Sequence, residues 1–183
     1  MSSEIRKSGI DPEAELIVDF VNTLDLETGA DAIAEPAALA DWAEANVAGL
    51  GAPAVDASAQ RRVLALRESL RALMRANNGG ELEPGQLDAL AEASERSRYR
   101  ATLSDGRLAI EPAGTGLEPL EARLLLAVER LQAGGAWPRL KACPAGDCEW
   151  AFFDTSRNHS RTWCSMEECG NRAKTRRYRS RRR

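Results

Sequence analysis

Aromatic residues and histidine are scarce in this sequence of 183 residues. Aromatic side chains make up 5% of it, and His159 is its only histidine. Because 43% of the residues are hydrophobic, a core can still form, and it must consist mainly of Leu, Ala, Val and Ile. Before residue 139 there is neither Cys nor His, and no glycine-rich loop of the kind that cradles phosphate. These absences remove the commonest catalytic arrangements, and we expect that the protein is not an enzyme.

Long apolar runs are missing as well. No stretch approaches the ~18 uninterrupted apolar residues of a membrane span. The first residues, MSSEIRKSGIDPEAE, lack the apolar segment of a signal peptide. We therefore expect a cytoplasmic protein with no membrane partner. In a reducing compartment, clustered cysteines favour metal binding over disulfides.

Charge is divided unevenly along the chain. Residues 1–138 carry 13 basic and 23 acidic side chains, a net charge of −10, whereas residues 139–183 carry 12 basic and 5 acidic ones, a net charge of +7. This segregation is typical of a regulator whose basic end meets phosphates. It also suggests a division into an acidic domain over residues 1–138 and a basic module over residues 139–183.

The four cysteines all lie in the basic module and form two pairs. Cys143 and Cys148 are separated by four residues, as are Cys164 and Cys169, and 15 residues lie between the pairs. Two close pairs at this separation are typical of a tetrahedral four-thiolate zinc site. We expect one structural zinc ion per chain, with no open coordination position. His159 is an alternative ligand, but it falls in a predicted turn and four thiolates already suffice.

The residues after the last cysteine are strongly basic. Eight of the fourteen residues 170–183 are Lys or Arg and none is acidic. A metal module with a cationic arm is the usual electrostatic pattern of a nucleic-acid-binding protein. The candidate nucleic-acid-binding residues are Asn171, Arg172, Lys174, Arg176, Arg177 and Arg179.

The segment that carries the last two cysteines also resembles a known family. The run WCSMEECGNRAKTRRYR is similar to the CGNR zinc-finger family, whose name matches residues 169–172 here. Proteins of that family carry an N-terminal helical domain, the ABATE domain, with a segment like LxLDFVNT. Residues 16–23 read LIVDFVNT, with Val18 as the departure. The family is described as stress-induced transcriptional regulators, so the resemblance implies DNA binding, transcription regulation and a role in the stress response.

Residues 16–23 also contain a candidate ligand site. Asp19, Asn22 and Thr23 occupy the polar faces of the first predicted helix. One interpretation is that they are solvated. The other, prompted by the family motif, is a polar network that faces a pocket, with Asp19 and Asn22 as the ligand-binding residues.

Hydrophobic periodicity predicts the elements of the acidic domain. Apolar residues at helical spacing predict helices that begin at Pro12 and Pro36, a long helix over residues 58–77, a fourth after Pro84 and a fifth over about residues 120–131. Alternation around Asp105-Gly106 predicts a β-hairpin. The arginines of the long helix, Arg67 and Arg71 among them, are expected on a salt-bridged, solvated face.

The basic module is expected to be a small treble-clef-like unit. Residues 149–154 and 161–163 would pair as a hairpin, with Trp150, Phe152 and Trp163 as its core. Ser165 and Glu168 form a capping box, which predicts a helix from Met166 towards residue 179. The alternative is a helix with Asn171 as its N-cap. The expected fold is thus mainly α with one β-hairpin in the helical N-terminal domain, plus a C-terminal four-cysteine zinc module.

These patterns favour a zinc-dependent DNA-binding regulator whose helical domain is a sensor or an oligomerisation unit, so that a homodimer is one expected form. The alternative is a structural zinc protein that binds RNA or an acidic protein partner. Asn171 can pair with adenine and Arg172 with guanine if the helix start enters a major groove. The opposing interpretation is that both residues brace the zinc module.

Overall fold

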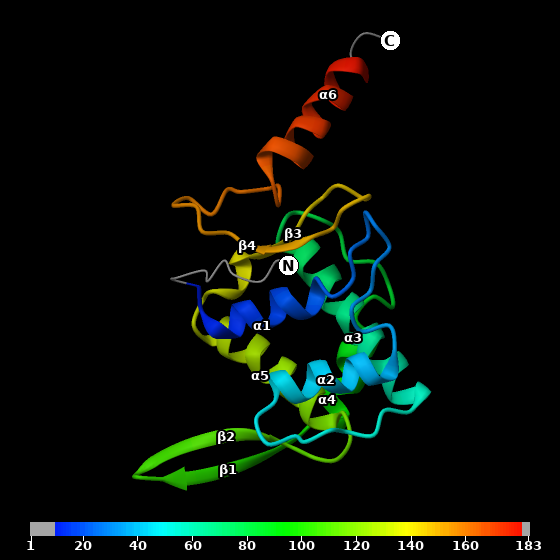
Figure 1. Ribbon diagram of the computed structural model, residues 1–183. Helices are drawn as coiled ribbons and strands as arrows, with labels where there is room; N and C mark the ends of the chain where they lie inside the picture. The colour runs from blue at the N-terminus through cyan, green and yellow to red at the C-terminus, as the bar shows by residue number, and fades with distance from the viewer. Residues whose placement is uncertain (1–9, 181–183) are drawn as a thin grey trace.

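The computed structural model of the chain describes residues 10–180 and is mainly helical, as the sequence predicts (Figure 1). The helices are α1 (Pro12–Val21), α2 (Pro36–Asn46), α3 (Ala57–Ala76), α4 (Asp88–Arg96), α5 (Glu118–Ala133) and α6 (Asn171–Ser180). The strands are β1 (Arg98–Ser104), β2 (Arg107–Ala113), β3 (Leu140–Ala142) and β4 (Ala151–Phe153). None of the described helices combines the length and apolar character needed to cross a bilayer.

The first helix begins and packs as its sequence indicates. The Asp11 side chain accepts a hydrogen bond from the backbone N–H of Glu13, and proline occupies the first helical position. Ile17 and Phe20 are fully buried. Phe20 stacks at a tilt against Trp42 of α2, with ring centroids 5.3 Å apart. Helix α1 is therefore central to the core.

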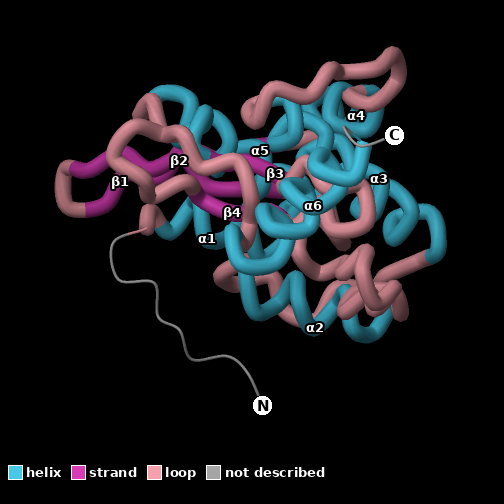
Figure 2. The backbone as a smooth tube through the Cα atoms, turned by 90° about the horizontal axis from the view of Figure 1, so that it is seen from above, coloured by secondary structure: helices cyan, strands magenta, loops and turns pink. Residues whose placement is uncertain are grey.

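The core lies between α1, α3 and α5, with α2 and α4 on opposite sides of α3 (Figure 2). Aliphatic side chains fill it, as the scarcity of aromatic residues requires. The largest buried aliphatic side chains are those of Ile17, Ile33, Leu39, Leu66, Leu70, Met74, Leu120, Leu124, Leu131 and Leu140.

The predicted hairpin is present and projects from the helical body (Figure 1). Asp105 and Gly106 join β1 to β2, and both have positive φ, 51° and 73°, which favours the tight turn that matches the strand twist. Near this turn Leu103 pairs with Leu108. Both side chains are exposed, so the hairpin tip contributes nothing to the core.

Two arginines of α3 are buried, which corrects the expectation of a solvated face. Arg67 and Arg71 are 3% and 2% exposed. Arg67 forms a two-pronged pair with Asp31, at 2.8 and 2.9 Å. Arg71 donates to the carbonyl oxygens of Val21 and Glu149 at 2.7 and 3.0 Å. The end of α1 and the loop after it leave buried acceptors, and a buried acceptor must be paired with a donor.

The short sheet of the basic module shares the helical core. Leu140 in β3 is fully buried, and Ala151 in β4 is 1% exposed, and both pack among the side chains of α1, α3 and α5. The hydrophobic core therefore continues across residue 138. Independent folding of the first 138 residues remains a prediction.

Three asparagine side chains reinforce this junction through backbone groups of the module and of the segment just before it. The Asn22 amide both donates to the Ala151 carbonyl, at 2.9 Å, and accepts from the Ala151 N–H, at 2.7 Å. The Asn77 side-chain amide donates hydrogen bonds to the carbonyls of Trp137 and Leu140. The Asn78 side-chain amide donates to the carbonyls of Ala142 and Thr162. Such contacts fix the orientation of the module on the body.

Truncation of Leu140 tests whether the module and the body unfold together. We expect Leu140→Ala to destabilise the helical domain by about 2–5 kcal/mol, because it opens a cavity in a shared core. Chemical denaturation followed by far-ultraviolet circular dichroism measures this. Leu103→Ala is the matched control, since Leu103 is 74% exposed and its truncation should change the free energy of unfolding by less than about 0.5 kcal/mol. Equal effects of the two substitutions would contradict a shared core.

Candidate metal centre and nucleic-acid interface

The first cysteine pair lies in the loop that joins β3 to β4. These strands are antiparallel, with Leu140 opposite Phe153 and Ala142 opposite Ala151. The expected pairing of residues 149–154 with residues 161–163 is therefore wrong. The Cys143 N–H donates to the Trp150 carbonyl at 3.0 Å, so the ladder extends to the first cysteine. A knuckle of this kind turns both thiols of the pair to the same side.

The segment expected to form the second strand, residues 161–163, is not paired as a strand, and a buried ion pair contacts the backbone at its start. The Lys141 ammonium contacts the Asp154 carboxylate at 2.7 Å and donates to the carbonyls of His159 and Arg161 at 2.7 and 3.1 Å. Asp154 also accepts from the backbone N–H of Ser156 and of Arg161. Burial disfavours its charge, but the hydrogen bond from Lys141 and the other donors lower the pKa of Asp154 to about 2. This network shapes the loop between the cysteine pairs.

The second cysteine pair is positioned by the start of the C-terminal helix. The Ser165 hydroxyl accepts from the Glu168 N–H at 3.2 Å, as the predicted N-cap does. One π-helical turn, Met166–Gly170, follows and carries Cys169, and α6 continues from it. The Asn171 side chain does not cap this helix but donates to the Glu167 carbonyl at 2.9 Å. The helix therefore begins at Met166.

The four cysteines converge on one point. Their Sγ atoms all lie within 4.8 Å of one another, and those of Cys148 and Cys169 are 3.5 and 3.7 Å from that of Cys164. A tetrahedron of thiolates about 2.3 Å from zinc has edges of about 3.8 Å, so the donor set fits the ion. All four are free thiols, and only Cys164 is more than slightly exposed. Four cysteines are thus poised to bind a metal, whereas His159 is exposed and stands outside this group.

The surroundings of the thiols shift their pKa values in different directions. Burial raises the pKa of Cys148 to about 11, and burial together with the neighbouring thiols raises the pKa of Cys164 further. Burial acts in the same direction on Cys169, but hydrogen bonds from Arg172 and the neighbouring thiols outweigh it and lower its pKa. A metal would hold all four groups as thiolates, and its binding would release their protons.

Two residues after Cys169, Gly170 and Arg172, are closely packed. A side chain at Gly170 would place Cβ 2.5 Å from the Met166 sulfur, so only glycine fits without a shift. The Arg172 guanidinium donates to Cys169 Sγ at 3.1 Å and to the Glu27 carboxylate at 2.8 Å. Both Asn171 and Arg172 therefore make bracing contacts.

Loss of the Arg172 contact should weaken metal binding. We expect Arg172→Ala to lower zinc affinity by about 10- to 100-fold, the usual effect of removing a hydrogen bond to a ligand. Competition with a chromophoric chelator measures this. Arg176→Ala removes the same charge from the same helix without a contact to sulfur, so it should leave zinc affinity unchanged. Equal losses in the two variants would indicate a general effect of charge.

The other candidate nucleic-acid-binding residues lie along α6, which points away from the body (Figure 1). Lys174, Arg176 and Arg179 are exposed, and the nearest acid to Arg176 is Asp147, at 3.9 Å. Arg177 lies in α6, but its side chain is outside the described part of the structure. Among the candidates whose side chains the structure describes, Arg172 contacts the body, through Glu27. The exposed basic residues are thus available on a helix that continues directly from the turn with Cys169.

The two candidate pocket residues have different surroundings. Asp19 is exposed on α1, while the Asn22 amide is engaged by the Ala151 peptide group. Neither residue lines the arginine-rich groove described below or the hollow of about 590 Å³ between Glu27 and α6. Asn22 thus has a structural partner within the chain, and the pocket beside these residues remains a prediction.

Comparisons with known proteins agree with this arrangement. Residues 139–182 match the family model of the CGNR zinc finger, and residues 14–151 match the ABATE model, described as "Putative stress-induced transcription regulator". Among curated proteins no match was found. The two family matches overlap at β3, the knuckle and the start of β4, the segment that shares the helical core. The chain therefore belongs to the ABATE family and carries a CGNR zinc finger.

Proposed function

We propose that the protein is a zinc-dependent DNA-binding transcriptional regulator, with α6 as its DNA contact and the helical body as a sensor or an oligomerisation unit. The observation that carries this proposal is a projecting basic helix that directly follows the π-helical turn with Cys169, one of the four cysteines poised to bind a metal. Metal binding would fix the direction of this helix relative to the body. The match to a family of transcription regulators supports the same function.

The distribution of charge supports one orientation on DNA. The acidic body, with a net charge of −10 over residues 1–138, is repelled by phosphates, while α6 is attracted to them. Lys174, Arg176 and Arg179 are exposed on the helix. The DNA would therefore meet the far end of α6, away from Glu27.

One zinc ion per chain would serve structure rather than catalysis. Four thiolates complete a tetrahedron, which leaves no position for a substrate or an activated water. We accordingly propose that the protein is not an enzyme and that its metal organises the helix.

The salt dependence of DNA binding tests this proposal. If residues 174, 176, 177 and 179 neutralise four phosphates, the logarithm of affinity should fall against the logarithm of salt concentration with a slope of about −3.6 or steeper. Fluorescence anisotropy with a labelled duplex measures the slope. Deletion of residues 174–183 should abolish binding, because the cations that release counterions are lost.

Arg107→Gln is the charge control for this experiment, because it removes a basic side chain from the projecting hairpin and should leave the slope unchanged. Binding of single-stranded or duplex RNA more tightly than DNA would replace DNA as the partner. Binding that survives the deletion would show that α6 is not the contact.

A further inference from the structure

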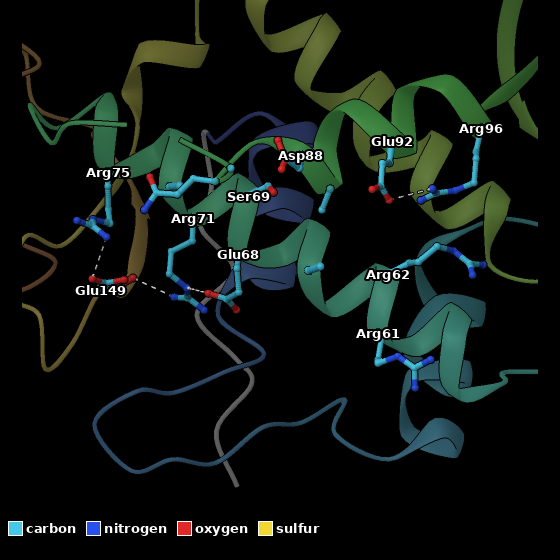
Figure 3. Close-up of a pocket in the computed structure, with 15 residues that line it drawn as sticks. Arg61, Arg62, Glu68, Ser69, Arg71, Arg75, Asp88, Glu92, Arg96 and Glu149 are labelled. Carbon is cyan, nitrogen blue, oxygen red and sulfur yellow. Dashed lines mark hydrogen bonds and ion pairs between the residues drawn. The ribbon is translucent and has the colours of Figure 1, made fainter. Parts of the chain in front are cut away.

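A long groove runs between α3 and α4 and ends at the zinc knuckle (Figure 3). Its volume is about 560 Å³, within the range of small-molecule sites. Small side chains open the space: Ala65, Ser69 and Ala72 on α3 and Ala89 on α4 line it. Larger residues at these positions would fill the hollow.

The groove concentrates arginines in an otherwise acidic domain. Five line it: Arg61, Arg62, Arg71, Arg75 and Arg96. Its carboxylates are those of Glu68, Asp88, Glu92 and Glu149, so the lining carries a net charge of +1. Residues 1–138 as a whole carry −10. Glu121, beside Arg62 and Arg96, brings the local balance to zero, so the groove is less acidic than the domain around it.

Several of these arginines are poorly matched to the acids beside them. In the part of the chain that the structure describes, Arg62 Nε is buried without a hydrogen-bond partner, and its nearest carboxylate oxygen, on Glu121, is 3.7 Å away. Arg96 reaches the acids only at 3.3–3.5 Å, and Arg75 reaches Glu149 at 3.4 Å. Charge-assisted hydrogen bonds are normally about 2.7–2.9 Å long, so these guanidinium groups retain capacity for another anion.

We infer that this groove binds a small organic anion, a carboxylate or a phosphate ester, as an effector. The guanidinium groups at the rim of the groove would hold the anionic group of this ligand. The apolar part of the ligand would contact the alanine side chains. Arginine suits this role because its planar donor fork matches carboxylate and phosphate oxygens. The groove is lined by acids as well as arginines, which disfavours a polyanionic nucleic acid strand.

One end of the groove is connected to the metal centre. Arg75 pairs with the Glu149 carboxylate, and Arg71 donates to the Glu149 carbonyl at 3.0 Å. Glu149 follows the metal-binding Cys148 directly and has a positive φ of 47°. An anion on Arg75 would compete with the Glu149 side chain and so alter the knuckle. An effector in this groove would give the helical body its sensor role, and that role rests on the proposed function.

Fluorine NMR on the intact, zinc-loaded chain tests this inference. Tryptophan is replaced by 5-fluorotryptophan, and the resonance of Trp150, which follows Glu149, is assigned with Trp150→Phe. The probes are succinate and phenyl phosphate, added at constant ionic strength. We expect a saturable shift of the Trp150 resonance.

Two variants and one control decide the origin of the shift. Arg75→Gln removes an anion contact, and Ala65→Leu fills the groove without a change of charge; each should weaken binding about tenfold or more. Arg107→Gln lies outside the groove and should bind as the parent does.

Linear, unsaturable shifts with both probes, or saturable shifts that are the same in all four proteins, would overturn the inference. A shift that only a DNA duplex produces, and that Arg75→Gln loses, would also overturn it and make the groove a second nucleic-acid contact. No nucleic acid is needed for the small-anion assay, so its failure is distinguishable from failure of DNA binding.

Discussion

Removal of zinc by a chelator should release α6 and the loop before it while the helical core stays folded. The apolar cluster at the metal centre is small: Cys143, Ala145, Cys148 and Cys169 are its buried members, with Trp163 and Cys164 packed against them. Structural zinc contributes roughly 10–16 kcal/mol to modules of this size, far more than such a cluster can supply. The strands β3 and β4 differ, because Leu140 and Ala151 belong to the main core. We therefore expect the loss of order to begin after Asp154.

Amide hydrogen exchange followed by mass spectrometry measures this effect. Peptides from residues 155–180 should lose protection when zinc is removed and regain it when zinc is restored, whereas peptides from α1, α3 and α5 should change little. Cys164→Ser should reproduce the loss in the presence of zinc. Ser160→Ala, in the same loop, is the control and should exchange as the parent does. If α6 stayed protected from exchange in protein without bound metal, the hypothesis that zinc orders this part of the module would be contradicted.

Local sequence patterns were sufficient for the helical body. Helix α1 has a capping aspartate, a first-turn proline and apolar residues at helical spacing, so its beginning and its buried face could both be predicted. The Asp105-Gly106 turn defined the β1–β2 hairpin in the same way. These signals are readable because each depends on residues only a few positions apart.

The junction with the zinc finger could not be predicted, because it depends on residues that are far apart in the sequence. Strand β3 has three residues, with Lys141 in the middle, which is too short for a pattern of alternation. Asn22 and its partner Ala151 are separated by 129 positions. Asn77 and Asn78 directly follow α3, and their side chains bind backbone carbonyls of the finger. Polar side chains that bind distant backbone groups leave no periodic signal in the sequence.

The candidate site was predictable to a similar extent. Cysteine spacing identified the four thiols that converge, because short pairs that bind one ion must turn towards it. It could not show that Arg172 would contact Cys169 and Glu27, because the Glu27 loop is 145 positions away. The sequence left base reading and bracing equally open for Arg172, and the observed contacts favour bracing.

Substitution of Asp154 should cause the largest loss of stability that a single side chain outside the cysteines can produce in the finger. Its carboxylate is fully buried against the Lys141 ammonium, whose side chain is 8% exposed. Asp154→Ala leaves that ammonium without a counter-charge and two backbone N–H groups without an acceptor. Removing one partner of a buried ion pair costs about 3–5 kcal/mol. Urea denaturation of the zinc-loaded chain measures this cost, and Asp147→Ala, at a side chain that is 51% exposed, should cost less than about 0.5 kcal/mol.

Acid should reproduce part of this loss in the parent protein. Because Lys141 and the backbone donors lower the pKa of Asp154 from 3.8 to about 2, its ionised form is favoured by folding. The resulting stability is complete above about pH 4 and is lost as the pH falls from there towards 2, with a total of about 2 kcal/mol. Thiolate protonation also releases zinc in acid, so the informative quantity is the difference in unfolding free energy between the parent and Asp154→Asn at each pH. That difference should shrink as the pH falls towards 2, since the Asp154 carboxylate then becomes increasingly protonated. A difference that stays constant from neutral pH to pH 2 would show that Asp154 is not ionised in the folded protein.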